Sequence, residues 1–280
     1  MSGTLPEDRH TVVEGHGVRY WKTGDGPPLV LIHGLGASAE IWMHNYEAFS
    51  RDYTVYAPDV TGFGRSERPT APCSLSDLLM GFIGQFMDRL GIERAHLVGQ
   101  SLGGGMALKT ALTCPERVDK LILVGSAGLG SGVTHSLRLM SLPVIGELLS
   151  RPSRIGVRIF FSLAVKDRAV LTKDFLDLYY RLFSLPGAQR MLLATVREIV
   201  DMRGAKDHLV RPIMDNLHRL TLPALIIWGR QDRVLPVAQA YFAHENLAGS
   251  RLIIYDNCGH VVNLERPREF NRDVLDFLSP

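Results

Sequence analysis

Short aliphatic or β-branched runs alternate with segments of helical spacing over much of this 280-residue chain. Most of these runs are followed by a turn signal and then a helix, the alternation that builds a parallel sheet covered by helices on both faces. The pattern predicts an α/β fold with a mostly parallel central sheet flanked by helices. The expected strands are Val18–Lys22, Leu29–His33, Thr54–Ala57, Ala95–Val98, Leu121–Gly125, Ala224–Trp228 and Arg251–Tyr255.

One of the expected helices carries a clear apolar stripe. Ser74 and Ser76 are both candidates for its N-cap, and Gly91 follows its end. The apolar face of this helix is marked by Leu75, Leu78, Leu79, Phe82, Phe86 and Leu90.

The alternation stops between about Leu129 and His218, where no strand-like run of comparable quality occurs. We therefore expect an all-helical lid at residues 129–218, inserted before the last two strands, between two parts of an α/β core at residues 1–128 and 219–280. Its Met and Phe side chains suit a cover over a cleft better than a solvent-facing insert. Its helices are expected to be separated by prolines: Pro143, Pro152, Pro186 and Pro212.

Composition excludes several classes of partner. The chain has 31 Lys and Arg against 29 Asp and Glu, a net charge of +2, and no basic run interleaved with aromatic residues, so a nucleic-acid partner is not expected. No stretch approaches the roughly 18 uninterrupted apolar residues of a membrane helix, so no membrane insertion is expected. The segment Met1–His10 lacks a secretory pattern, which favours a cytoplasmic location. Cys73, Cys114 and Cys258 suggest neither a disulfide framework nor a zinc site.

The most informative motif is Gly-Gln-Ser-Leu-Gly at residues 99–103, between an expected strand and the helix Met106–Thr113. At such a turn a serine stands clear at the top of the sheet in a strained conformation, and the two glycines leave room for the crossing strand and helix. The helix N-terminus directs its dipole and free N–H groups toward a developing oxyanion. Ser101 is therefore the predicted nucleophile.

A serine nucleophile needs a base, and the base needs a carboxylate. Asp232 and His260 each follow one of the last two strands. Because catalytic groups gather at the carboxyl ends of strands in open α/β sheets, Ser101, His260 and Asp232 form the predicted triad. Asp256 and Asp59 compete for the role of the acid, although Asp256 lies only four residues from His260.

The loop after the strand at residues 29–33 is glycine-rich. Acyl transfer needs two N–H donors for the oxyanion, and the predicted pair is the amides of Leu35 and Leu102. Gly34 and Gly36, followed about 20 residues later by Asp59, also mimic a dinucleotide fingerprint. A dinucleotide site would leave the triad unexplained, so no metal and no organic cofactor is expected.

The chain resembles the α/β-hydrolase superfamily over essentially its whole length, and in particular its branch of lidded esterases and carbon–carbon hydrolases. A serine at position 101 argues against haloalkane dehalogenase and epoxide hydrolase chemistry, because those enzymes carry Asp there. The motifs that carry the resemblance are His33–Gly36, Asp59–Ser66, Gly99–Gly104, Gly229–Asp232 and Cys258–His260.

Two segments, Leu90–Gly99 and Gly125–Gly130, are similar to the meta-cleavage-product hydrolases of aromatic degradation. Those enzymes usually have Asn before the nucleophile and Trp after the catalytic His, whereas this chain has Gln100 and Val261. The resemblance implies a dienoate substrate that needs a cationic anchor in the lid. The candidates for this anchor are Arg158, Arg190 and Arg197.

The sequence favours a serine hydrolase that cleaves small to medium, largely apolar carboxylic esters through an acyl-enzyme. The first alternative is hydrolysis of a carbon–carbon bond in a vinylogous diketone, and the second is a ligand receptor that keeps the triad with little turnover. The oligomeric state, monomer or homodimer, is left open. The residues expected to contact the substrate are Gln100, Met140, Phe160, Phe161, Met191, Arg197 and Val261.

Overall fold

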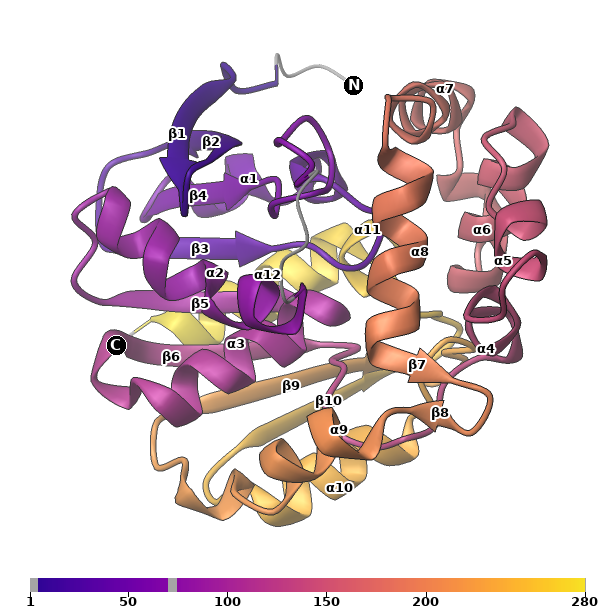
Figure 1. Cartoon of the computed structure of the whole chain (residues 1–280). Coiled ribbons are helices and arrows are strands. Elements are labelled where there is room, and N and C mark those ends of the chain that lie inside the picture. Colours follow the sequence, from indigo (N-terminus) through magenta and orange to yellow (C-terminus); the bar gives the residue numbers. More distant parts are fainter. Residues whose placement is uncertain (1–4, 70–74, 280) are drawn as a thin grey trace.

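An eight-stranded sheet runs through the centre of the computed structural model (Figure 1), which describes residues 5–69 and 75–279, with the backbone alone for residues 75–78. The strand order is β1-β2-β4-β3-β5-β6-β9-β10. The pairs β1–β2 and β2–β4 are antiparallel and the other pairs are parallel, which confirms the mostly parallel sheet. The strands are β1 (Arg9–Val13), β2 (His16–Thr23), β3 (Pro28–Ile32), β4 (Thr54–Pro58), β5 (Ala95–Gln100), β6 (Val118–Val124), β9 (Ala224–Gly229) and β10 (Arg251–Tyr255).

Helices cover both faces of the sheet because alternate strand residues point to opposite sides. In β3, Val30 and Ile32 belong to one hydrophobic cluster, and Leu29 and Leu31 belong to the other. The first cluster includes side chains of α2 (Leu75–Arg89), α3 (Leu102–Thr113) and α10 (Ala238–Asn246). The second includes side chains of η1 (Ala39–Trp42), α1 (Tyr46–Phe49), α11 (Val262–Glu265) and α12 (Pro267–Leu278).

All seven expected strands are present, but β1 was not predicted. Its sequence, Arg-His-Thr-Val-Val, is mostly solvent-exposed and gives a weak apolar signal. It pairs with β2 through a tight hairpin in which Glu14 and Gly15 both have positive φ, as a two-residue turn requires. Of the two expected N-caps of α2, Ser74 lies outside the described residues, and Ser76 lies inside the helix and cannot cap it.

The chain between β6 and β9 folds mainly into helices, which Figure 1 places beyond the carboxyl end of β3. The expectation of an all-helical insert was wrong in one detail, because β7 and β8 form a short antiparallel hairpin. Pro212 lies inside α9 instead of between helices, although a proline there removes one backbone hydrogen bond of the helix. A lid at residues 129–218 stays a prediction. The elements are α4 (His135–Met140), α5 (Ile145–Leu149), α6 (Arg154–Ala164), η3 (Arg168–Val170), α7 (Lys173–Phe183), α8 (Ala188–Ile199), β7 (Val200–Asp201), β8 (Gly204–Ala205), α9 (Asp207–Met214) and η4 (Leu217–Arg219).

Two of the three cysteines lie in the described ranges, and both Cys114 and Cys258 are free thiols. Burial raises the pKa of the Cys258 thiol far above its usual range, so it stays protonated. Across residues 5–69 and 75–279, each helix is too short or too polar to cross a bilayer.

Candidate active site

Ser101 occupies the sharp turn between β5 and α3. Its φ of 54° and ψ of −120° lie in a region that non-glycine residues rarely adopt, at a cost of about 1–3 kcal/mol. The flanking glycines are required by packing. A Cβ on Gly99 would lie 2.6 Å from the Cα of Gly104, and a Cβ on Gly103 would lie 2.7 Å from the carbonyl oxygen of His33. The turn therefore forms only where strand and helix backbones meet without side chains between them.

His260 and Asp232 form the hydrogen bond that a triad requires. The Nδ1 of His260 lies 2.7 Å from Oδ2 of Asp232, whose side chain is fully buried. The other carboxylate oxygen accepts the backbone N–H groups of Val234 and Leu235 at 2.7 and 2.9 Å. Because Nδ1–H donates to an anchored carboxylate, the Nε2 of His260 is left free to accept a proton. His260 and Ser101 line the same cavity.

The two carboxylates that compete with Asp232 for the role of the acid bind other groups of the protein. Asp256 is exposed and pairs with Arg230. Asp59 is fully buried, and its two oxygens accept the backbone N–H groups of Ala39 and Arg65 at 2.7 and 2.8 Å. Since protein groups occupy both oxygens, Asp59 cannot bind a ribose, and the dinucleotide alternative loses its acidic residue.

The expected oxyanion donors lie on either side of the nucleophile. Leu102 is the first residue of α3, Leu35 follows β3, and both line the cavity. Within the described ranges, neither backbone N–H donates to another protein group. Gly34 lies directly against the nucleophile, because a Cβ there would be 2.8 Å from the Cβ of Ser101. The loop after β3 thus lies directly against Ser101, as the predicted pair of oxyanion donors requires.

His33 holds that loop in place through two hydrogen bonds of its imidazole ring. The N–H of Val60 donates to its Nε2 at 2.9 Å, so the proton is on Nδ1, which donates to the carbonyl oxygen of Gly34 at 2.8 Å. The ring is therefore neutral, and burial lowers the pKa of His33 to about 4. The imidazole joins the loop after β3 to the loop after β4.

A buried ion cluster, which sequence reasoning missed, lies next to this loop. Arg19 is 2% exposed and pairs with Asp59 at 3.2 Å, Glu40 at 2.9 Å and Asp8 at 2.5 Å. Glu40 also pairs with Arg65. The available signal was the single acidic residue in the otherwise apolar segment 39–42. The cluster positions the loops around the site, because charges buried this deeply are stable only when they are paired.

A cavity of about 520 Å³ extends from Ser101 along one face of α3. The α3 residues that line it have helical spacing, since Leu102, Gly105, Lys109 and Leu112 follow one another at three- and four-residue steps. Helix α9 contributes to the lining through His208, Leu209, Pro212 and Ile213. The predicted contact residues that line the cavity are Gln100, Met140, Phe160, Phe161 and Val261.

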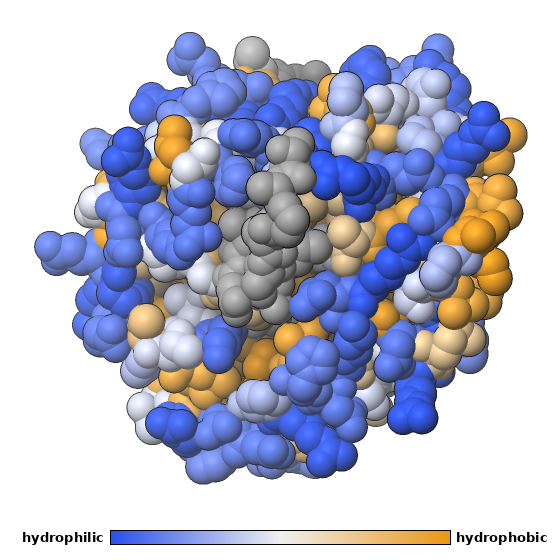
Figure 2. Space-filling model, viewed as in Figure 1, coloured by the Kyte–Doolittle hydropathy of each residue, from blue (hydrophilic) through white to orange (hydrophobic). Residues whose placement is uncertain are grey.

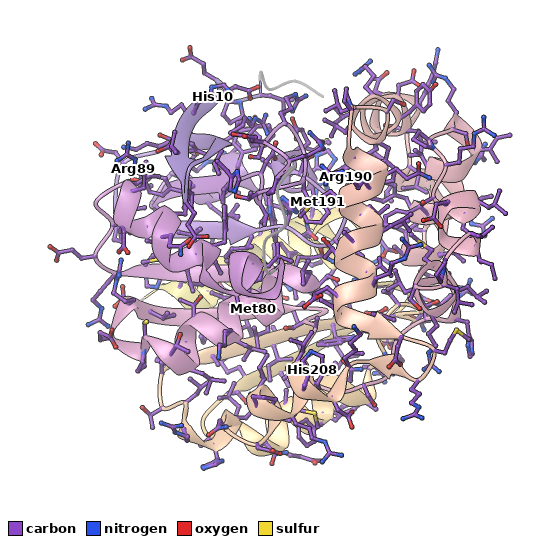
Figure 3. The ribbon with its side chains drawn as sticks, in the orientation of Figure 1. His10, Met80, Arg89, Arg190, Met191 and His208 are labelled. Atoms are coloured by element: carbon purple, nitrogen blue, oxygen red, sulfur yellow. The ribbon has the colours of Figure 1, made fainter. Side chains whose placement is uncertain are left out.

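Two predicted contact residues lie elsewhere on α8. Met191 is buried against Gly62, where a Cβ would meet its sulfur at 3.0 Å. Arg197 binds the carboxylate of Glu147 at 2.8 and 2.9 Å. Arg190, a candidate anchor that Figure 3 labels beside Met191 on α8, donates to the backbone carbonyl of residue 69. Composition identified these side chains but could not show which face of α8 the cavity meets.

The charged residues lining the cavity are all potential cations. No carboxylate belongs to its lining in the described ranges, whereas Lys109, Arg219, His208 and the expected base His260 do. Arg158, Arg190 and Arg197 are not part of the lining. Sequence reasoning missed Lys109, although its position seven residues after Leu102 places it two turns further along the same face.

Glu265 supports the loop that carries His260. Its Oε1 accepts the N–H of Gly259 at 2.9 Å, and its Oε2 accepts the N–H groups of residues 166–167 at 2.8 and 2.9 Å. The N–H of His260 itself donates to the carbonyl oxygen of Ala164 at 2.7 Å. Burial raises the pKa of Glu265. These contacts join the expected base to the segment after α6, and no local sequence pattern revealed them.

Comparison with known proteins gives consistent matches over nearly the whole chain. A family model described as "Alpha/beta hydrolase family" matches residues 29–273. A 2-hydroxy-6-oxononadienedioate/2-hydroxy-6-oxononatrienedioate hydrolase from Burkholderia vietnamiensis is 33% identical over 269 residues, which cover 93% of this chain and 90% of that protein. The meta-cleavage product hydrolase CumD from Pseudomonas fluorescens IP01 superposes with a TM-score of 0.82 at 32% identity, over 96% of both chains. The 2-hydroxy-6-oxo-6-phenylhexa-2,4-dienoate hydrolase BphD from Rhodococcus sp. strain RHA1 gives 0.84 at 26% identity, over 97% of this chain and 98% of that one.

Replacement of Glu265 by Gln removes one of the two acceptor oxygens and places an NH₂ group against a backbone N–H. We expect the free energy of unfolding, measured in urea, to fall by about 1–3 kcal/mol. We also expect kcat to fall at least about tenfold with a smaller change in KM, because the loop of His260 is displaced. Glu269→Gln, at an exposed position on α12, is the matched control. Unchanged kcat in a folded Glu265→Gln protein would contradict the positioning role.

The buried His33 makes stability depend on pH. Between about pH 6.5 and 4 the unfolded chain binds a proton at this imidazole while the folded protein keeps it neutral. The contribution of the neutral His33 imidazole to the free energy of unfolding is therefore fully present above about pH 6.5 and is lost as the pH falls toward 4. Relative to His33→Gln, whose amide oxygen still accepts the N–H of Val60, we expect the wild type to lose about 2–3 kcal/mol between pH 7.5 and 4.5. If the unfolding free energies of the wild type and of His33→Gln changed equally with pH, His33 would not be the group responsible.

Proposed function

The chain belongs to the α/β-hydrolase family, and from this premise we propose that it is a serine hydrolase with Ser101 as nucleophile, His260 as base and Asp232 as the acid that orients the base. The observation that carries the proposal is the 2.7 Å hydrogen bond from His260 to the buried Asp232, in a cavity that also contains the strained turn at Ser101. This combination supplies an activated nucleophile and its orienting partner.

The reaction follows from these groups. Ser101 Oγ attacks a carbonyl carbon of the substrate while Nε2 of His260 takes its proton, and Asp232 stabilises the imidazolium that forms. The amides of Leu35 and Leu102 donate to the oxyanion. His260 then protonates the leaving group, and a water molecule activated by the same imidazole releases the acid.

The first candidate substrate is a meta-cleavage product, whose carbon–carbon bond is hydrolysed. The relatives named above support it more strongly than they support the ester expected from the sequence. In this reaction the leaving group is a carbon atom, so the electron pair of the broken bond must be delocalised over a conjugated dienolate before the carbon takes a proton from His260. An anionic dienoate also needs a cationic partner near the nucleophile.

Among the cavity residues that can carry a positive charge, we propose Lys109 as that partner. It follows Leu102 on the same face of α3, about 10 Å along the helix axis, and helix side chains lean toward the N-terminus, here toward Ser101. The sequence-based candidates Arg158, Arg190 and Arg197 do not line the cavity. Lys109 therefore takes the anchoring role in this proposal.

A carboxylic ester is the second candidate, and the lining close to the nucleophile favours it. Gln100 and Val261 stand where the meta-cleavage-product hydrolases usually have Asn and Trp, and Met140 and Phe160 add further apolar surface. An alcohol leaving group needs no delocalisation and takes its proton directly from His260. An apolar acyl chain would gain about 0.8 kcal/mol for each buried methylene.

Parallel assays with one substrate of each class separate the dienoate from the ester. The purified protein is assayed with 2-hydroxy-6-oxo-6-phenylhexa-2,4-dienoate, followed by loss of the dienolate absorbance, and with p-nitrophenyl butyrate, followed by release of p-nitrophenolate. We expect kcat/KM to be at least about 100-fold higher for the dienoate. The reverse preference would establish the ester as the substrate class. Turnover of neither compound would favour the receptor that keeps the triad.

Covalent labelling tests the nucleophile directly. We expect a fluorophosphonate to add one equivalent at Ser101, because the triad activates this hydroxyl. Ser101→Ala should abolish labelling, and Asp232→Asn should lower kcat on the order of 10⁴-fold, because an amide in place of the carboxylate favours the wrong imidazole tautomer. Ser136→Ala is the matched control, since Ser136 lines the same cavity. Labelling that survives in Ser101→Ala would assign the nucleophile elsewhere.

Lys109→Met tests the anchor. We expect KM for the dienoate to rise about tenfold or more, because a charged hydrogen-bond partner of the carboxylate is lost, while the neutral butyrate ester is unaffected. Lys173→Met, at an exposed position on α7 outside the cavity lining, is the control. An equal effect on both substrates would show that Lys109 does not recognise the carboxylate.

A further inference from the structure

An unusually apolar surface lies on α4, α5 and α6. Among the described residues, eight of the 13 exposed large hydrophobic side chains fall in this one stretch of the chain. Figure 2 shows hydrophobic side chains gathered along the right-hand edge of the molecule, where Figure 1 places α5 and α6. We call this surface the α4–α6 face; it consists of Leu139, Val144, Ile145, Leu148, Leu149, Ile155, Ile159 and Leu163.

Helix α6 is apolar on two sides. Val157 and Phe161 are buried against the protein, whereas Ile155 and Ile159 are 72% and 55% exposed. A surface helix of a soluble domain normally turns polar residues outward, and a helix that is apolar all round is normally covered. Nothing in the described chain covers this side of α6. The outward stripe therefore has no role in the packing of the isolated chain.

The turn before α5 presents another apolar side chain to solvent. Val144 has a φ of 69° and lies at the centre of a three-residue turn closed by the hydrogen bond from Ile145 N–H to the carbonyl oxygen of Pro143. A β-branched residue in this conformation is strained, and glycine or asparagine would fit the turn better. The side chain of Val144 is nonetheless 69% exposed. Backbone strain that holds an apolar side chain outward is consistent with a contact surface.

The charges on this face are basic. Between Leu148 and Ala164 the sequence contains three arginines and no acidic residue. Arg154 pairs with Asp177 and lies over the ring of Tyr180 at 5.0 Å.

The two other arginines of this segment are free. Arg151 and Arg158 are exposed, and neither takes part in an ion pair within residues 5–69 and 75–279. The neighbouring Glu147 is already paired with Arg197. The face therefore combines apolar side chains with uncompensated positive charge.

We propose that the α4–α6 face docks on an anionic lipid surface. Helices that lie in a membrane interface combine aliphatic side chains on one side with arginine or lysine beside them, and each basic residue near an anionic leaflet contributes to binding. A second copy of this chain fits less well. In a symmetric dimer this face would meet itself, bringing Arg151 and Arg158 of both copies together without an acidic partner in the segment.

The face is continuous with the cavity. Leu149, Ile159 and Leu163 belong to the α4–α6 face and also line the space above Ser101. An apolar substrate dissolved in a bilayer can therefore pass into the cavity along an apolar surface without crossing water. Docking of the face on lipid does not depend on which bond is cleaved, whereas the route from the bilayer serves an apolar ester and not the anionic dienoate.

The test is co-sedimentation of the whole protein with phosphatidylcholine vesicles, with and without phosphatidylglycerol. We expect binding to the phosphatidylglycerol vesicles that weakens as salt is raised. The double variants Leu148→Asp/Ile155→Asp and Arg151→Gln/Arg158→Gln should each reduce the partition coefficient about tenfold or more. None of these four residues lines the cavity, so both proteins should keep wild-type turnover of a water-soluble substrate. Val12→Asp, an exposed apolar position on β1, is the control.

Four results would overturn the proposal. The first is wild-type protein that binds neither vesicle, and the second is binding that both double variants retain. The third is a dimer in sedimentation equilibrium that Leu148→Asp/Ile155→Asp dissociates, because it would assign the face to contact between copies. The fourth is equal binding to both vesicles, which would reject the anionic lipid as the occupant.

Discussion

The close approach of three backbone segments around Ser101 is the constraint on which the site depends. Gly99 and Gly103 allow β5 and α3 to meet, and Gly34 allows the loop after β3 to lie against the nucleophile. The same contact brings the loop that carries Leu35 next to the start of α3. Strain at Ser101 is offset by the paired parallel strands on either side of β5. A methyl group at any of the three glycines would push apart the backbone segments that meet around Ser101.

Polar groups, not apolar packing, fix the loops at this edge of the sheet. Loops that close over a buried site leave backbone N–H groups that need acceptors. His33, Asp59 and Glu265 supply those acceptors, each from a buried side chain that joins two loops. Arg19 then compensates the charge of Asp59. The geometry of the candidate site is thus supported by buried polar and charged side chains that are not part of the cavity lining.

Much of the fold could be predicted from the sequence, and so could the residues of the candidate triad that the structure brings together, because strand runs and their following loops are local signals. Seven strands were predicted, and Asp232 was chosen from its place after β9. Contacts between distant residues could not be predicted, since Glu265 reaches residues about 100 positions earlier. Met191 and Arg197 were misplaced because composition does not tell which side of α8 faces a cavity. The preference for an ester rested on two departures from a family pattern, and the relatives favour the carbon–carbon alternative.

The hydrogen bonds between the end of α6 and the loop of His260 couple the position of this helix to that of the candidate base. Ala164 accepts the N–H of His260, and Glu265 binds the backbone of residues 166–167, just beyond the end of α6. The C-terminal end of α6 is therefore part of the base's own support and cannot swing away while His260 keeps its position. A widening of the cavity that leaves His260 in place would therefore have to come from the other end of α6, where Arg154 begins the helix next to α5.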